Sequence, residues 1–213
     1  MRQPLLQIAL DLIQADVALE IAQRIASKVD ILEIGTPLLK AVGVRIITDF
    51  KAKFPDKLIL ADTKTMDVGA LEARLAFNAG ADMMTVCAAA PLETIQSATS
   101  EAQRWHKDVV VDFIGVKDKR TRALEIVPLS PAYFNLHTAI DVQKTFGKSF
   151  RELAEFRDFQ IPLVVAGGIA PEDIPELMKY QPAIIVVGSF VTRAKDPFMA
   201  VMALRRAIED ALS

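Results

Sequence analysis

"LILADTKTMD" (residues 58–67) joins a short apolar run directly to a cluster of charged residues. The run ends at Asp62, and Lys64 and Asp67 follow within five positions. An apolar run of this length, rich in Leu and Ile, is typical of a strand that is buried on both faces. The charged residues that follow could simply belong to a solvent-exposed loop. Whether they form part of a functional site depends on which residues end the other strands of the chain.

Short apolar runs recur along the whole sequence, and most are rich in Val, Ile and Leu, as in parallel strands. The weakest is interrupted by Asn135. The runs, which we predict to be strands, are residues 5–10, 31–35, 58–62, 83–87, 109–113, 133–137, 163–168 and 184–189.

Helix-like segments lie between these runs. Residues 16–29 carry an apolar stripe at i, i+4 spacing. Residues 91–105 begin with proline and have a glutamate in the first turn, and residues 196–212 begin with an N-cap aspartate followed by proline. A short helix is expected within residues 118–132, and Gly80 marks a helix end just before a strand.

Strands that alternate with about eight helices predict a (β/α)₈ TIM barrel, which we expect to be one compact domain over residues 1–213. An open doubly wound sheet is the alternative. It would ordinarily use fewer strands and place a glycine-rich turn after the first, whereas residues 9–16, "ALDLIQAD", contain no glycine.

Composition narrows the classes of partner. The 213 residues carry a formal net charge of −2, which gives no electrostatic reason to expect nucleic acid or an anionic membrane as partner. The single cysteine, Cys87, cannot form an intramolecular disulfide. No apolar stretch approaches the roughly 20 residues that cross a bilayer, and we see no signal peptide, so we expect a cytoplasmic protein.

Polar residues gather at the carboxyl ends of the predicted strands, which converge on one mouth of such a barrel. Four are carboxylates, which repel one another unless a cation compensates them. Lys64 is one such cation, and its side chain points the same way as that of Asp62 if the strand stays extended. The residues are Asp11, Glu33, Asp62 with Lys64, Asp112 and His137.

A bound divalent metal would be a second compensating cation. Glu33 and Asp62 offer the oxygen ligands that suit Mg²⁺, which often takes only one or two carboxylates. The alternative is that both are ordinary strand-end residues paired with Lys or Arg.

Two small-residue pairs end the seventh and eighth predicted strands: Gly167 with Gly168, and Gly188 with Ser189. Backbone N–H groups at these positions form the phosphate site common in such barrels, so we predict a phosphorylated small molecule as ligand. Tight turns that need positive φ would explain one pair adequately and both pairs less well.

His137 ends a strand toward the mouth, so we favour a functional role over packing. Cys87 has no evident basic partner to activate its thiol, and we interpret it as a packing residue.

The sequence resembles the orotidine monophosphate decarboxylase suprafamily. "ADTKTMD" (61–67) matches its Asp-x-Lys-x-x-Asp signature, and "QIALD" (7–11), "VDILEIGTPLLK" (29–40) and "VVVDFIGVKD" (109–118) extend the match. So do "LHTAID" (136–141), "VAGGI" (165–169) and "VVGS" (186–189). Within the suprafamily the chain looks most like 3-hexulose-6-phosphate synthases, which join formaldehyde to D-ribulose 5-phosphate in a Mg²⁺-dependent aldol reaction through an enediolate.

The resemblance implies a role for each residue. Glu33 and Asp62 would hold Mg²⁺, Lys64 would stabilise the enediolate, and His137 would exchange the proton. Asp11 and Asp112 would orient hydroxyl groups or hold Lys64, and the two small-residue pairs would bind phosphate. Asp67 would reach into the active site of a second subunit, which implies a homodimer with shared sites.

Related activities leave alternatives. In 3-keto-L-gulonate 6-phosphate decarboxylases an arginine-containing stretch follows the histidine, whereas Thr138 and Ile140 stand here; they also tend to carry Glu at position 112 and Arg at 189. Ala139 stands where the synthases usually have glycine, and the loop 141–149 is longer than theirs. Both are expected to border the mouth, so the resemblance determines the substrate less firmly than the fold. "VCAAAP" (86–91) also departs from the synthases' usual sequence.

More distant alternatives fit the residues less well. Orotidine monophosphate decarboxylase works without a metal, which would leave Glu33 without a task. Ribulose-phosphate 3-epimerase uses two strand-end histidines, and only His137 is so placed. A non-catalytic barrel that binds sugar phosphates would keep the glycine pairs but would be free to lose the acid–base residues.

Overall fold

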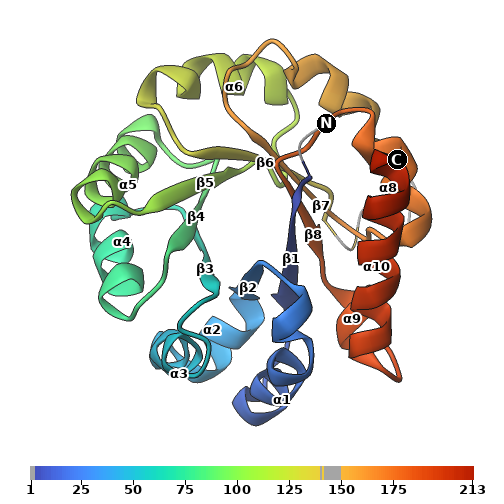
Figure 1. The fold of residues 1–213 in the computed structure, drawn as a ribbon. Helices are drawn as coiled ribbons and strands as arrows, with labels where there is room; N and C mark the ends of the chain where they lie inside the picture. Colours follow the sequence, from blue (N-terminus) through green and yellow to red (C-terminus); the bar gives the residue numbers. More distant parts are fainter. Residues whose placement is uncertain (1–2, 140, 142–149) are drawn as a thin grey trace.

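The computed structural model describes residues 3–139, 141 and 150–213. The strands form a closed parallel barrel in the order β1-β2-β3-β4-β5-β6-β7-β8, with helices around the outside (Figure 1). This confirms the predicted (β/α)₈ TIM barrel. The strands are β1 (Leu5–Leu10), β2 (Ile31–Ile34), β3 (Leu58–Thr65), β4 (Met83–Cys87), β5 (Asp108–Asp112), β6 (Tyr133–His137), β7 (Leu163–Ala166) and β8 (Ile184–Val187).

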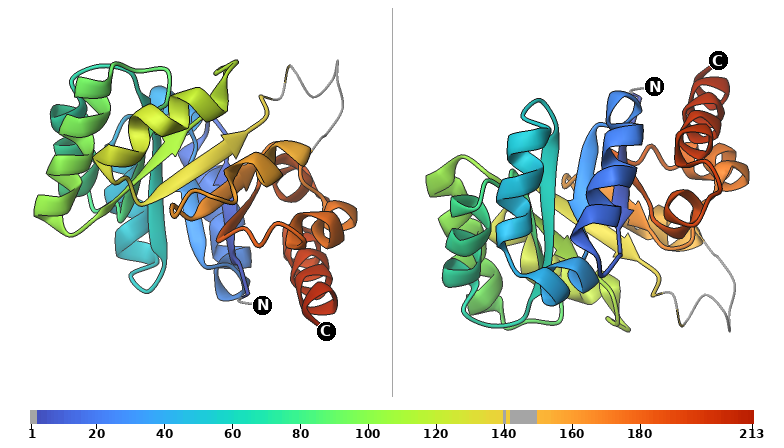
Figure 2. Two further views of the ribbon diagram at one scale, coloured as in Figure 1. Left: turned by 90° about the horizontal axis from the view of Figure 1, so that it is seen from above. Right: turned by 90° about the horizontal axis from the view of Figure 1, so that it is seen from below.

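The helices pack around the outer face of the barrel, and α10 lies against both α8 and α1 (Figures 1 and 2). Asp196 caps α10, since its side chain accepts a hydrogen bond from the backbone N–H of Phe198 at 3.1 Å. The described α-helices are α1 (Ala15–Ile25), α2 (Thr36–Val42), α3 (Arg45–Lys53), α4 (Gly69–Asn78), α5 (Leu92–Trp105), α6 (Lys119–Ile126), α8 (Ile174–Met178), α9 (Ser189–Thr192) and α10 (Pro197–Leu212).

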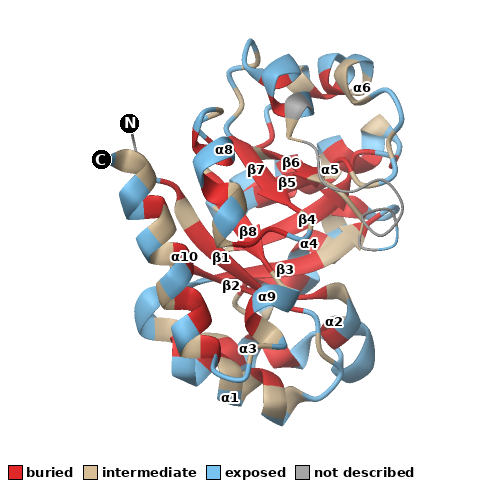
Figure 3. Cartoon of the chain, turned by 90° about the vertical axis from the view of Figure 1, so that its right-hand side faces the viewer, coloured by how far each residue is buried: buried red, intermediate tan, exposed pale blue. Residues whose placement is uncertain are grey.

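Alternation along the strands divides the apolar residues into two cores. In β1, Ile8 and Leu10 pack with the surrounding helices, whereas Ala9 packs inside the barrel. Both faces of the strands are therefore buried, as Figure 3 shows by the red strands beneath helices with pale blue outer faces. The barrel interior contains Ala9, Ile31, Leu60, Met83, Val110, Val164, Ala166, Ile184 and Val186.

Several element ends differ from the predictions. α1 ends at Ile25, and a 3₁₀ turn covers Ala26–Lys28, so the predicted helix 16–29 is interrupted near its end. β7 and β8 end at Ala166 and Val187, one residue before the glycine pairs. Residues 142–149 of the loop 141–149, which we expected to border the mouth, lie outside the described residues, as does Ile140. None of the helices in the described ranges is both long and apolar enough to cross a bilayer.

Candidate active site

The predicted polar residues do meet at the carboxyl end of the barrel. Because all strands are parallel, residues at their carboxyl ends share one edge, and their charges influence one another. The group combines Asp11 after β1, Glu33 on β2, Asp62 and Lys64 on β3, Asp112 on β5 and His137 on β6.

Lys64 lies at the centre of this group. Its Nζ donates hydrogen bonds to Oδ1 and Oδ2 of Asp62 at 2.9 and 2.8 Å and to Oδ2 of Asp112 at 3.1 Å. Burial alone would lower the pKa of Lys64, but the charges of Asp62 and Asp112 outweigh it and raise the pKa above its ordinary range. The ammonium therefore stays charged throughout the physiological pH range.

Asp112 connects this ammonium to the imidazole of His137. The side chain of Asp112 is fully buried, and its Oδ2 lies 3.0 Å from Nδ1 of His137. Burial raises the pKa of Asp112, but the hydrogen bond and charge of His137, the charge of Lys64 and the backbone N–H of Ile114 bring it below the ordinary value. An ionised Asp112 favours the proton on Nδ1, which leaves Nε2 as the nitrogen that can exchange a proton.

Glu33 is the least compensated carboxylate. Its side chain accepts a hydrogen bond from Nε2 of Gln7 at 2.6 Å inside the barrel. Burial, followed by the charges of Asp62 and Asp11, raises the pKa of Glu33 well above the ordinary value. Asp62 and Glu33 are therefore close enough to repel each other, as two ligands of one cation would be.

The charge of the site fits a divalent cation. Four carboxylates surround one ammonium, and burial together with Asp62 also raises the pKa of Asp11. Within the described ranges, no three His, Cys, Asp or Glu side chains are arranged to bind one metal. Two carboxylates are enough for Mg²⁺, whose remaining ligands are commonly water and substrate oxygens. Glu33 and Asp62 thus suit this ion on charge and ligand type.

Sequence reasoning missed two residues that orient Asp62. Thr36, at the start of α2, donates from Oγ1 to Oδ2 of Asp62 at 2.8 Å, and Thr85 on β4 donates to Oδ1 at 2.8 Å. Together with Lys64, these donors occupy both carboxylate oxygens of Asp62. A cation that binds Asp62 would therefore take the place of one of these hydrogen-bond donors. Thr85 interrupts an apolar strand in the sequence, and this signal could have identified it. The same signal marks Gln7, the hydrogen-bond partner of Glu33.

The backbone at Lys64 differs from expectation. The shared direction of the Asp62 and Lys64 side chains was predicted on the condition that the backbone stays extended, but Lys64 has φ of 44°, in the left-handed region. The β3–β4 pairing shifts between Ala61 and Thr65, so the strand bulges between these two residues. The contact with Asp62 is therefore made across an irregular backbone, and not by simple alternation along a strand.

The two small-residue pairs follow the carboxyl ends of β7 and β8, and Gly188 lies beside Asp11. Gly167 and Gly168 have φ of 120° and 65°, and a Cβ on Gly167 would lie 2.6 Å from the carbonyl oxygen of Thr138. A structural need therefore explains the first pair. It does not explain Gly188, where a Cβ would meet its nearest atom, Oδ2 of Asp11, at 3.6 Å.

Two further predicted residues, Asp67 and Ser189, lie just after the ends of β3 and β8. Asp67 is exposed, and its Oδ1 accepts a hydrogen bond from the backbone N–H of Val68 at 2.7 Å. Ser189 is the first residue of α9, with Gly188 as its N-cap. Cys87 is buried, and burial followed by the charge of Asp112 raises the pKa of its thiol to about 11, which agrees with its interpretation as a packing residue.

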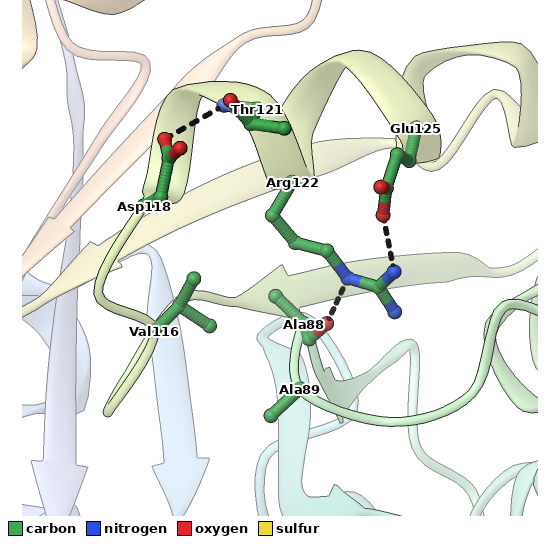
Figure 4. Close-up of a pocket in the computed structure, with 7 residues that line it drawn as sticks. All are labelled: Ala88, Ala89, Val116, Asp118, Thr121, Arg122 and Glu125. Carbon is green, nitrogen blue, oxygen red and sulfur yellow. Dashed lines mark hydrogen bonds and ion pairs between the residues drawn. The ribbon is translucent and has the colours of Figure 1, made fainter.

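A cavity of about 340 Å³ lies between the segments that follow β4 and β5 (Figure 4). Arg122 on α6 crosses it and donates hydrogen bonds to the carbonyl oxygens of Ala88 and Ala90 and to Glu125. Its lining contains none of the predicted site residues. The arginine fixes the segment after β4, part of the stretch that departs from the usual synthase sequence.

The chain is similar to known enzymes over nearly its whole length. A 3-hexulose-6-phosphate synthase from Mycobacterium gastri is 43% identical over 204 residues, covering 95% of this chain and 99% of the relative. The crystal structure of the Salmonella typhimurium 3-hexulose-6-phosphate synthase superposes with a TM-score of 0.93 at 33% identity, covering 97% of this chain and 99% of that one.

A 3-keto-L-gulonate-6-phosphate decarboxylase structure from Vibrio cholerae has a TM-score of 0.86 at 29% identity, covering 98% of this chain and 99% of that one. Similarity to the synthases over nearly the whole length shows that the chain is an enzyme of the lyase type. The family model described as "Orotidine 5'-phosphate decarboxylase / HUMPS family" matches residues 4–204, and the chain belongs to that family.

Proposed function

We propose that the enzyme joins formaldehyde to D-ribulose 5-phosphate in a Mg²⁺-dependent aldol reaction that gives 3-hexulose 6-phosphate. The observation that carries the proposal is the charged Lys64 held between Asp62 and Asp112, with His137 on the other side of Asp112. This arrangement offers a base and a fixed positive charge to a carbanion-like intermediate. The curated synthase relatives support the choice of reaction.

The residues divide the reaction between them. His137, held through Nδ1 by Asp112, takes a proton at Nε2 from the carbon beside the ketose carbonyl. The electron pair left behind forms an enediolate, whose negative charge the Lys64 ammonium stabilises. The enediolate carbon attacks the carbon of formaldehyde, and His137 gives its proton from Nε2 to the formaldehyde oxygen as the new carbon–carbon bond forms.

Glu33 and Asp62 would hold the magnesium ion, which supplies Lewis acidity to the ketose oxygens when it is bound. Asp11 lies between the Gly35 and Gly188 backbones, where its carboxylate can orient a substrate hydroxyl. Backbone N–H groups of Gly167, Gly168, Gly188 and Ser189 would receive the phosphate. Because a phosphorylated sugar does not cross membranes freely, this substrate supports a cytoplasmic location.

A parallel assay tests the proposal against the decarboxylase alternative. The protein is incubated with Mg²⁺ and either ribulose 5-phosphate plus formaldehyde or 3-keto-L-gulonate 6-phosphate. We expect formaldehyde-dependent loss of ribulose 5-phosphate and no release of carbon dioxide. Threonine at position 138 and serine at 189, where the decarboxylases tend to carry arginine, support this expectation. Carbon dioxide release without aldol product would contradict it.

We also propose that the enzyme is a homodimer in which Asp67 completes the partner's site. Four apolar side chains around Asp67 are exposed, with Leu71 and Leu75 one turn apart on α4. We call the set Met66, Val68, Leu71 and Leu75 the α4 surface. Clustered exposed apolar residues beside a functional residue are typical of an interface between subunits.

Analytical ultracentrifugation tests the dimer. Leu71→Glu would place a charge in the α4 surface, so we expect a shift from dimer to monomer and a loss of activity with it. Leu124→Glu is the matched control, since Leu124 is 58% exposed on α6 and lies outside the α4 surface. A wild-type protein that sediments as a monomer would contradict the proposal.

A further inference from the structure

Thr85, in the middle of β4, contacts three consecutive residues of β3. Its side-chain hydroxyl donates to Oδ1 of Asp62 and accepts from the backbone N–H of Lys64, both at 2.8 Å. Its carbonyl oxygen accepts a hydrogen bond from Oγ1 of Thr63 at 2.6 Å. Only 3% of Thr85 is exposed, so water does not replace these contacts. One residue thus holds the main chain and a side chain of the candidate site together.

The bulge in β3 explains why such a contact is needed. Ala61 pairs with Met84 and Thr65 with Val86, so four steps along β3 match two along β4. Within this bulge Lys64 has φ of 44°, which side-chain-bearing residues adopt uncommonly. The regular ladder does not pair the backbone N–H of Lys64, and the Thr85 hydroxyl accepts its hydrogen bond instead.

We propose that Thr85 is a positioning residue that holds Lys64 in the left-handed conformation and fixes the Asp62 carboxylate. Its hydroxyl performs both tasks at once, because the hydrogen goes to Asp62 while a lone pair accepts from Lys64. The Lys64 ammonium is thereby aimed between Asp62 and Asp112. Thr85 acts through these residues, and the inference rests on the proposed function for its kinetic consequence.

Two substitutions separate the hydroxyl from the rest of the side chain. Thr85→Val keeps the shape and removes the hydroxyl, whereas Thr85→Ser keeps the hydroxyl and removes a methyl group. We expect kcat to fall on the order of 100-fold in the valine variant, because misplacing a catalytic group by about 1 Å has that effect. The serine variant should stay within a few-fold of wild type, and KM for ribulose 5-phosphate should change little in both.

A control variant tests whether removing any buried hydroxyl has this effect. Thr99 on α5 is 4% exposed, and its Oγ1 has no hydrogen-bond partner in the described part of the chain. Thr99→Val should therefore leave kcat unchanged. Thermal melting of all variants shows which ones are folded, and Thr85→Ala serves as the hydroxyl-free variant if Thr85→Val does not fold.

Backbone amide exchange followed by NMR gives a readout that needs no turnover. The Lys64 N–H should exchange about tenfold faster or more in the valine variant and near the wild-type rate in the serine variant. Unchanged exchange in the valine variant, or equal loss of kcat in the valine and serine variants, would overturn the inference. If wild-type protein shows no aldol turnover, the proposed function fails, while amide exchange still decides the role of Thr85.

Discussion

Replacing Lys64 by methionine keeps most of the side-chain volume. Among the described residues of the candidate site, it removes the only lysine. The ammonium of Lys64 donates hydrogen bonds to Asp62 and Asp112, and only 25% of the Lys64 side chain is exposed to solvent. Removing one preorganised donor to a developing oxyanion typically costs 10²–10³-fold in kcat. Since this donor also carries a full charge, we expect a loss of at least about 10³-fold, or roughly 4 kcal/mol of transition-state stabilisation.

Formaldehyde-dependent consumption of ribulose 5-phosphate, measured at saturating Mg²⁺, gives kcat and KM for this variant. We expect the effect mainly in kcat, since the phosphate site that we propose at the ends of β7 and β8 does not include Lys64. Unfolding by denaturant should show that Lys64→Met is folded. Without metal, its free energy of unfolding should be lower than that of wild type by roughly 3 kcal/mol, because the buried carboxylates of Asp62 and Asp112 lose their cationic partner. Lys64→Ala should abolish turnover as well. A kcat within tenfold of wild type would refute the role assigned to Lys64.

Three further predictions concern other residues. Gly167→Ala should raise KM for ribulose 5-phosphate and lower Tm, because a Cβ there would lie 2.6 Å from the Thr138 carbonyl oxygen at a φ of 120°. Asp82→Asn should lower the free energy of unfolding by about 1–3 kcal/mol at pH 7. The Asp82 carboxylate accepts hydrogen bonds from Nζ of Lys51 and Lys107 and from the backbone N–H of Ile59. Burial raises the pKa of Asp82, but these hydrogen bonds lower it overall. The difference in free energy of unfolding should therefore shrink as pH falls below about 4, where the unfolded aspartate takes up its proton. Cys87, whose thiol pKa is raised to about 11, should react with iodoacetamide at pH 8 far more slowly than unfolded protein, as mass spectrometry would show.

Much of the fold could be predicted because both faces of each strand are buried. Such strands appear as apolar runs, and even the run interrupted by Asn135 forms β6, with Asn135 only 7% exposed. Strand ends were less predictable: β7 stops at Ala166 because Gly167 turns to positive φ, and glycine type alone does not show where the turn begins.

The candidate site was predictable where it is charged. Carboxylates, lysine and histidine at strand ends are conspicuous in an apolar chain, and the structure brings them together. Neutral donors are not conspicuous, so Thr36 and Thr85 were missed although both orient Asp62. The left-handed turn at Lys64 could not be predicted either, because it depends on a hydrogen bond from a different strand.

The central claim is that Glu33 and Asp62 together hold a divalent cation. Calorimetric titration of metal-free protein with Mn²⁺, and with Mg²⁺ as competitor, measures this directly without any substrate. We predict one site per chain whose affinity falls at least about 100-fold in Glu33→Gln, while Glu20→Gln, the same change at an exposed position on α1, binds like wild type. Equal binding by wild type and Glu33→Gln would contradict the account.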